Sequence, residues 1–248
     1  DCSVDYLMPT YDQVFDFISL LDKPEECVFL LTHIGGWVNP DIESIAELCK
    51  DKKITLVEDC AHSLGATLHG KHTGLFGDVG VYSLYATKAV PAGEGGIVVT
   101  NDKELFNMVD KFAIYDRFDQ VLDTGINIRM SEISALLCYS VITETEAIIA
   151  NKYGIAEKYI TACDKYDWEY INPISNGQRS NLYKFILLSR SISPTDDFSQ
   201  IKTRTSPVYD YALGRDLAGV KDRHICLPIW YELEDKMVEK VVSELEKS

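Results

Sequence analysis

Lys88 is the residue of this sequence whose surroundings most favour covalent chemistry. It follows a strand-like segment, residues 79–84, and it precedes Pro91 and a glycine-rich turn at residues 93–96. Apolar neighbours lower the pKa of an ammonium group by desolvation, and a neutral amine is a nucleophile toward carbonyl groups. Most of the 24 lysines and arginines are expected to be solvated surface charges, so this setting separates Lys88 from the rest.

Asp59 and His62 form a second candidate pair. Asp59 comes just after the apolar segment 54–57, and His62 follows three residues later. In a parallel α/β sheet, ligands bind at the carboxyl ends of the strands, which is where Asp59 is expected to stand. Taken singly, a carboxylate at such a place is more often a helix cap or a solvated loop residue, and a lone histidine is more often structural. The interest of both residues therefore rests on their combination with Lys88.

The elements that must position these residues follow from periodicity. The sequence predicts helices at 11–21, 42–49, 101–114, 133–149, 153–163 and 233–245, and strands at 27–31, 54–57, 79–84, 97–100 and 183–188. Strand, helix and strand over 27–57 make a βαβ unit, and its two continuous apolar strands predict a parallel sheet covered on both faces. A domain boundary is expected within a helical connector near residues 145–150.

Composition limits the class of protein. The chain has 248 residues and 46% hydrophobic residues, which excludes a disordered chain, and its net charge of −15 argues against nucleic acid and anionic membranes as partners. No apolar run reaches the roughly 18 residues of a spanning helix. The seven cysteines are scattered and never spaced CxxC, which is typical of reduced cytoplasmic thiols and not of a zinc site. His69 and His72 are read as a solvated hairpin, so no metal site is expected.

Four blocks of sequence, taken in order, resemble one family. They are EDCAHSLGA at 58–66, GDVGVYSLYATK at 77–88, GEGG at 93–96 and GINIRMSE at 125–132. This order is similar to that of the DegT/StrS-type nucleotide-sugar aminotransferases, which are fold type I enzymes dependent on pyridoxal 5'-phosphate (PLP). Pieces at 206–209 and 227–228 resemble the small C-terminal domain of that family, so the similarity runs through essentially the whole chain.

The resemblance implies a fold and a cofactor. It implies an α/β fold, with a mostly parallel sheet flanked by helices in a PLP-binding large domain at 1–147 and a smaller α+β domain at 148–248. Lys88 would hold PLP as a Schiff base and move the proton at the substrate carbon. Asp59 would pair with the pyridinium nitrogen, and His62 would stack on the ring.

The resemblance also implies which residues contact the cofactor phosphate. Ser83 would donate its hydroxyl to that phosphate, and Asn127 would reach the phosphate of the neighbouring subunit, which implies a homodimer with shared active sites. Family members carry about 80 further residues before the position of Asp1, including a helix start that binds the phosphate. The segment 113–117 departs from the basic turn usual in the family, and this departure concerns the substrate contacts.

The implied activity is transfer of an amino group, and two alternatives stay open. The substrate would be a keto group on a nucleotide-linked deoxysugar, with glutamate as the amino donor, in deoxyaminosugar and polysaccharide biosynthesis. One alternative is a sugar dehydratase on the same scaffold, using PLP or its amine form; some of these enzymes carry His where Lys88 stands. The other is a catalytically idle homologue with a binding or regulatory role.

Overall fold

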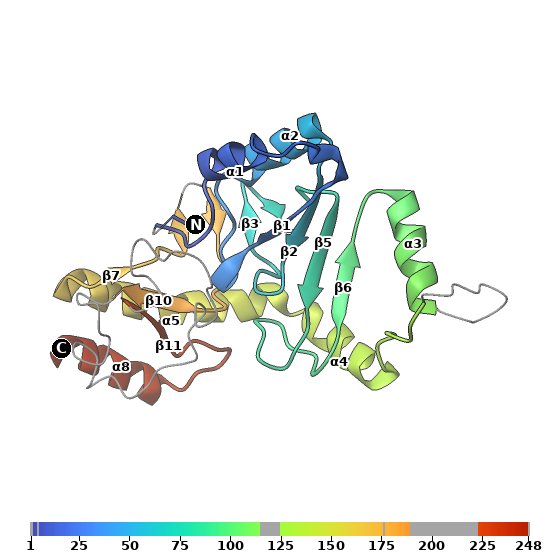
Figure 1. Ribbon diagram of the computed structural model, residues 1–248. Helices are drawn as coiled ribbons and strands as arrows, with labels where there is room; N and C mark the ends of the chain where they lie inside the picture. Colours follow the sequence, from blue (N-terminus) through green and yellow to red (C-terminus); the bar gives the residue numbers. More distant parts are fainter. Residues whose placement is uncertain (1, 4, 115–124, 176, 189–222, 248) are drawn as a thin grey trace.

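The computed structural model describes residues 2–247 except residues 4, 115–124, 176 and 189–222. Residues 115–117 of the segment that departs from the family, and the family-like piece at 206–209, lie outside the described residues. Figure 1 shows a large sheet with helices above and beside it, and a second group of helices and strands that carries the C-terminus.

The large sheet has the order β1-β2-β5-β6 (Figure 1). Its strands are β1 (Val28–Thr32), β2 (Thr55–Asp59), β5 (Val79–Ser83) and β6 (Gly96–Val99). The first three are parallel, and β6 pairs with β5 in the antiparallel direction. The predicted class, α/β with a mostly parallel sheet, is therefore confirmed.

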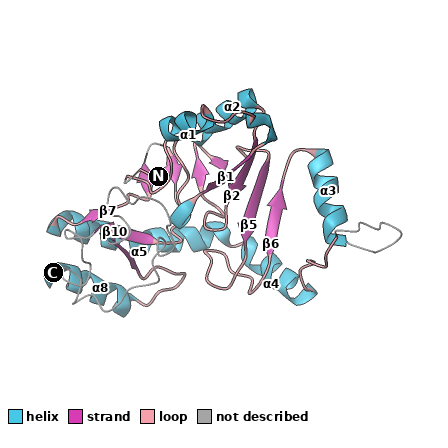
Figure 2. Ribbon diagram, viewed as in Figure 1, coloured by secondary structure: helices cyan, strands magenta, loops and turns pink. Residues whose placement is uncertain are grey.

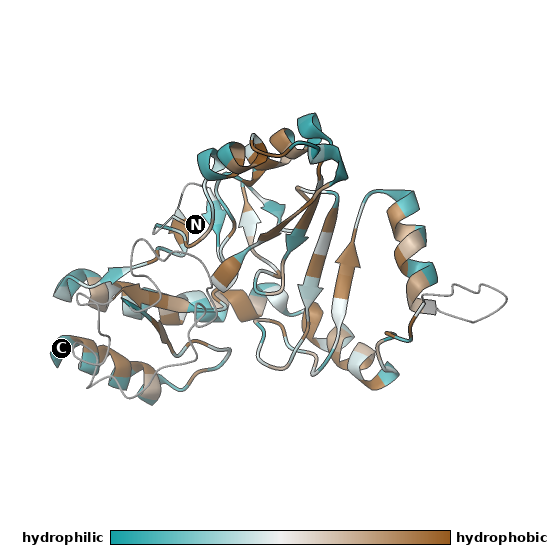
Figure 3. Cartoon of the chain, in the orientation of Figure 1, coloured by the Kyte–Doolittle hydropathy of each residue, from teal (hydrophilic) through white to brown (hydrophobic). Residues whose placement is uncertain are grey.

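Helices cover one face of this sheet. They are α1 (Tyr11–Ile18) and α2 (Ile42–Lys52), with short 3-10 turns η1 (Pro24–Glu26) and η2 (Ile34–Gly36) between them. The side chain of Thr10 accepts the backbone N–H of Gln13, and the side chain of Gln13 returns the contact, so a capping box starts α1. Apolar residues of both helices pack on Leu31 and Leu56 in one buried cluster, and Figure 3 shows brown, hydrophobic residues along the helices above the sheet.

The opposite face of the sheet is bare in the described part of the chain. Val28 and Leu30 alternate with half-buried Phe29 and buried Leu31 along β1, and the exposed fractions of Val28 and Leu30 are 65% and 60%. Val81 and Val98, which are cross-strand partners, are exposed on the same face. The expectation of a sheet covered on both faces is thus not met within the described residues, although apolar side chains stand on both.

The helices after β6 agree with the prediction at 101–114 and differ from it beyond that segment. They are α3 (Lys103–Ile114), α4 (Glu132–Ile142) and α5 (Thr145–Tyr166). The predicted helices at 133–149 and 153–163 are wrong in their division, since the break falls before Thr145 and no Gly or Pro interrupts residues 145–153. Among the described residues no single helix is long and apolar enough to cross a membrane; α4 and α5 pass that test only as a pair, bent by 60° at the break.

The C-terminal part packs a three-stranded antiparallel sheet against two helices. Its elements are β7 (Glu169–Tyr170), β10 (Phe185–Leu188), β11 (His224–Leu227) and α8 (Asp235–Lys247), with α5 as the second helix. A cluster that includes Tyr159, Phe185 and Val241 forms their core. The predicted strand at 183–188 and the closing amphipathic helix are confirmed, each within a few residues.

A third small sheet joins the two halves of the chain (Figure 2). Its strands are β3 (Thr67–Leu68), β4 (Lys71–His72), β8 (Ile174–Ser175) and β9 (Gln178–Arg179), and β3 pairs with β9. The β3–β4 hairpin confirms the predicted hairpin around His69 and His72. Residues beyond 170 pair with residues near 68, so this sheet crosses the predicted domain boundary at 147/148. That boundary remains a prediction.

Candidate active site

Asp59 is fixed at the carboxyl end of β2. Its Oδ2 accepts a hydrogen bond from Thr32 Oγ1 at 3.2 Å, and its Oδ1 accepts the backbone N–H of Ala61 at 3.0 Å. The sheet register pairs Asp59 with Thr32 on one side and with Val81 on the other, so its side chain lies on the bare face of the sheet. The carboxylate is therefore ordered by its neighbours and accessible to a ligand at the strand ends.

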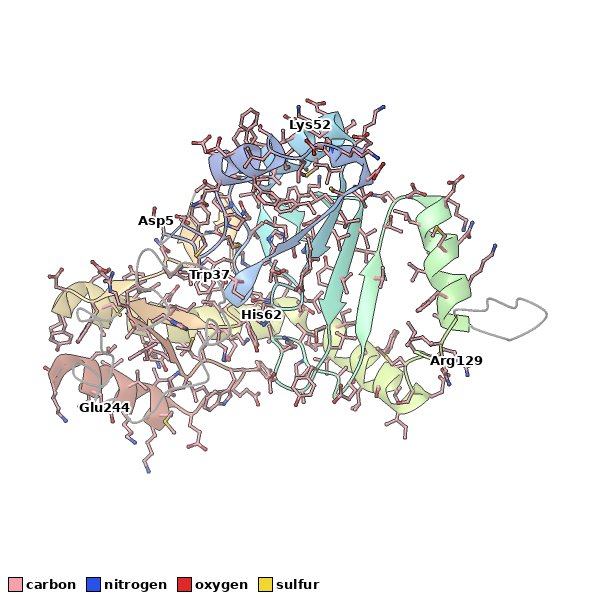
Figure 4. The ribbon with its side chains drawn as sticks, in the orientation of Figure 1. Asp5, Trp37, Lys52, His62, Arg129 and Glu244 are labelled. Carbon is pink, nitrogen blue, oxygen red and sulfur yellow. The ribbon has the colours of Figure 1, made fainter. Side chains whose placement is uncertain are left out.

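His62 lies beside a residue from the second half of the chain. Its ring centroid is 4.4 Å from that of Tyr183, and its Nδ1 accepts the backbone N–H of Gly35 at 3.2 Å. Burial lowers the pKa of His62 to about 4; Lys88 adds to the shift and the Asp59 carboxylate opposes it. The imidazole is thus a neutral, flat surface at neutral pH, near the centre of the molecule in Figure 4.

Lys88 lies in the turn after β5, against the same tyrosine. Its Nζ is 5.2 Å from the centroid of the Tyr183 ring. Burial lowers the pKa of Lys88, the Asp59 carboxylate opposes the shift, and the Lys184 ammonium adds to it. The structure therefore brings Lys88 within electrostatic reach of Asp59 and His62, and gives it the desolvated setting that the sequence predicts.

The structure places the other two predicted residues, Ser83 and Asn127, in different parts of the molecule. Ser83 ends β5 on the same sheet face as Asp59, two residues beyond Val81, and its Oγ accepts the backbone N–H of Tyr85 at 3.3 Å. Asn127 stands in the exposed loop before α4, where its Oδ1 accepts bonds from the backbone and side chain of Arg129. Arg129 is labelled at the α4 end of the molecule, well away from His62, in Figure 4. The structure thus groups Ser83 with the site and does not bring Asn127 to it.

A buried carboxylate underlies the site and was missed by sequence reasoning. Glu58 is fully buried, and its Oε1 accepts the backbone N–H groups of Phe76 at 2.7 Å and Gly77 at 2.6 Å. Its Oε2 accepts the N–H of Gly74 at 2.7 Å and lies 2.9 Å from His33 Nε2. Burial alone raises the pKa of this carboxyl, but these hydrogen bonds outweigh it and hold the pKa below its ordinary value.

The second ring nitrogen of His33 fixes its tautomer. His33 Nδ1 accepts the backbone N–H of Asn39 at 3.1 Å, so the proton of the ring sits on Nε2 and is donated to Glu58. The pair therefore ties the loop after β1 and the turn before β5 to the end of β2. Strand alternation along β2 is the signal in the sequence that could have identified Glu58. Because neighbouring residues of a strand point to opposite faces, a ligand-facing Asp59 requires that Glu58 point to the other face of the sheet.

His33, Glu58 and Cys60 lie close enough together to hold a metal ion, but their chemistry does not fit one. Both carboxylate oxygens and both ring nitrogens are already engaged in hydrogen bonds. Burial, with the charge of Glu58, raises the pKa of Cys60 to about 12, so its sulfur is a thiol and not the thiolate that metals bind. The hydrogen bonds of this cluster hold the end of β2 against the neighbouring loop and turn.

The residues at the strand ends do fit a planar, anionic aldehyde such as PLP. They supply an amine with a lowered pKa for the aldehyde, a carboxylate for a ring nitrogen and a hydroxyl for a phosphate, all near the ends of β2 and β5. Tyr183 was also missed by sequence reasoning, because about 95 residues separate it from Lys88 and nothing in its local sequence marks it.

The sequence profile of the DegT/DnrJ/EryC1/StrS aminotransferase family matches residues 23–209. Among curated proteins, the GDP-perosamine synthase of Escherichia coli O157:H7 is 35% identical over 124 residues. That alignment covers 48% of this chain and 34% of the relative, so the chain spans about a third of the length of this curated protein.

Solved structures agree with the fold. The aminotransferase TlmJ from Streptoalloteichus hindustanus superposes with a TM-score of 0.85 at 25% identity, covering 100% of this chain and 71% of that one. The GDP-4-keto-6-deoxy-D-mannose-3-dehydratase of E. coli, solved with bound hydrated PLP, gives a TM-score of 0.79 at 17% identity and covers 99% of this chain and 72% of its own. The second likeness shows the fold alone.

Proposed function

Because this chain belongs to the DegT/DnrJ/EryC1/StrS aminotransferase family, we propose that it is a PLP-dependent aminotransferase. Its substrate is the keto group of a nucleotide-linked deoxysugar, and glutamate is the amino donor. The observation that carries the proposal is Lys88, an amine with a lowered pKa that interacts with the Asp59 carboxylate at the ends of parallel strands.

When bound, PLP supplies an electron sink that stabilises negative charge at the substrate carbon. Lys88 Nζ holds the cofactor aldehyde and moves the proton at that carbon. The Asp59 carboxylate, ordered by Thr32, keeps a proton on the ring nitrogen, and the Ser83 hydroxyl donates to the phosphate. The neutral ring of His62 offers a flat face to the cofactor.

Borohydride trapping tests the cofactor assignment. The protein is incubated with PLP, reduced, digested and analysed by mass spectrometry, and we expect a pyridoxyl label on the peptide that contains Lys88. Lys88→Ala should abolish the label, whereas the matched change Lys71→Ala, at an exposed lysine of β4, should leave it intact. Labelling that is unaffected by Lys88→Ala, or no label on the wild-type protein, would reject the cofactor role and favour the idle homologue.

Product analysis tests the reaction itself. With a 4-keto-6-deoxy nucleotide sugar and glutamate, we expect an amine in the sugar product and 2-oxoglutarate in equal amounts. A product that has lost a hydroxyl group would favour the dehydratase alternative. The match to an aminotransferase family and the likeness to the aminotransferase TlmJ support the transfer reaction.

We also propose that the active protein is a homodimer with shared active sites. Support comes from α4, an apolar helix with no buried residue, in which Ile133 is 76% exposed and Leu136 is 70% exposed. Removing this surface from water needs a partner, and a second copy would carry Asn127, which lies just before α4, toward the other subunit's phosphate. The cytoplasm is the proposed location because all seven cysteines are free thiols.

A further inference from the structure

A cavity of about 560 Å³ opens beside Lys88 on the side of the C-terminal elements. Lys88, Lys152 of α5 and Lys184 supply its charged groups. Its described lining also includes the aromatic side chains of Tyr183, Trp230 and Tyr231 and contains no carboxylate. Three amino groups therefore share one cavity in a chain whose net charge is −15.

The innermost of these lysines is built into the structure. Lys152 is only 3% exposed, and its Nζ donates a hydrogen bond to Leu182 O at 3.3 Å. Burial lowers the pKa of Lys152 to about 8, and the charge of Lys184 adds to that shift. An ammonium has three N–H groups, so this side chain keeps donor capacity toward the cavity.

Lys184 connects the buried lysine with the reactive one. Its charge acts on both Lys152 and Lys88, and its Nζ lies 5.1 Å from the centroid of the Tyr183 ring. Burial lowers the pKa of Lys184 as well. Like charges in a partly desolvated cavity repel one another, and the arrangement is relieved when an anion binds between them.

We propose that Lys184 and Lys152 form an oxyanion subsite beside Lys88, which takes a carboxylate or phosphate group of a substrate. This inference rests on the proposed function for the identity of the substrates, but not for the binding of the anion. Two sources share the required chemistry: the second carboxylate of the amino donor and the diphosphate of the nucleotide sugar. Exposed Trp230 and Tyr231 at the rim offer apolar faces to the rest of either molecule.

Calorimetric titration with two unreactive probes tests the subsite and separates the sources. Glutarate stands for the donor, and GDP and dTDP stand for the nucleotide part. We expect Lys184→Met to lower the affinity for at least one probe class by about tenfold or more. Lys184→Arg keeps the charge, so its affinity should stay within about threefold of that of the wild-type protein. Loss confined to glutarate assigns the subsite to the donor, and loss confined to the diphosphates assigns it to the nucleotide.

Two further variants make the result specific. Lys152→Met should also weaken the binding of the affected probe. Lys158→Met, at an exposed lysine of α5 that pairs with Asp235, should leave the binding of both probes unchanged. Wild-type protein that binds neither probe at millimolar concentration, or a Lys184→Met protein that binds both as wild type does, would overturn the subsite. Borohydride labelling of Lys88 is measured on the same samples: probe binding without labelling rejects only the cofactor, and labelling without probe binding rejects only the subsite.

Discussion

Glu58→Gln is the perturbation for which the structure gives the most definite magnitude. The substitution keeps one acceptor oxygen, which can still receive the backbone N–H groups of Phe76 and Gly77. The new NH₂ group replaces the oxygen that accepts hydrogen bonds from Gly74 N–H and His33 Nε2–H. Those two donors would then face another donor in place of an acceptor. His33 cannot relieve the clash by moving its proton, because its Nδ1 already accepts the N–H of Asn39.

Two buried donors are thus left without an acceptor. Each such loss costs about 1–3 kcal/mol, so we expect the free energy of unfolding to fall by about 2–6 kcal/mol. That is a large part of the roughly 5–15 kcal/mol that stabilises a domain. Urea unfolding at pH 7, followed by circular dichroism without PLP, measures the loss, and Glu47→Gln on the exposed side of α2 is the matched control.

The pH dependence checks the cause. The pKa of Glu58 is lowered in the folded protein, so its carboxylate stabilises the fold above the ordinary value of 4.5, and that contribution is lost as the pH falls through the folded pKa. Glutamine does not titrate, and the difference between wild type and variant should therefore narrow below pH 4.5. A loss under about 1 kcal/mol at pH 7, or a difference independent of pH, would refute the reasoning.

Three other predictions use different features. The ring of His62, with its pKa near 4, should stay neutral in an NMR titration from pH 8 to 5, and because the unfolded ring titrates near 6.5, its contribution to stability should decline as the pH falls between these values. Gly80→Ala places a Cβ 2.6 Å from the backbone oxygen of Gly74 and should destabilise the protein by about 2 kcal/mol or more, whereas Gly154→Ala in α5, where nothing lies within 4 Å, should be neutral or stabilising in the same thermal unfolding assay. Leu136→Asp on exposed α4 should convert the proposed dimer to monomer by light scattering without lowering the melting temperature of the monomer.

Much of the fold could be predicted because its signals are local. The strands of the large sheet are short apolar runs that end at turn residues, and β1, β2, β5 and β6 fall within a few residues of the predicted segments. The division of α4 from α5 could not be found in this way. Residues 133–163 form one nearly continuous apolar pattern, and no Gly or Pro marks the break before Thr145.

The candidate site was predictable only in part, for a related reason. Asp59, His62 and Lys88 come from strand ends of one sheet, so the topology of that sheet is enough to expect them together. Tyr183, Lys184 and Lys152 reach the same place through tertiary contacts of the C-terminal part. No periodicity within their own segments specifies that meeting.

The end of β2 shows how support and chemistry share two adjacent residues. Strand alternation sends Glu58 to the covered face and Asp59 to the bare one. The buried carboxylate is fixed by four donors that belong to two separate segments, the loop after β1 and the turn before β5, whereas Asp59 is held by Thr32 and Ala61 and remains open to a ligand. Any shift of β2 along its own axis would break the first set and misplace the second carboxylate relative to Lys88. The stability lost in Glu58→Gln should therefore be accompanied by weaker PLP labelling of Lys88 even in the fraction of protein that remains folded, which a purely global destabilisation would not produce.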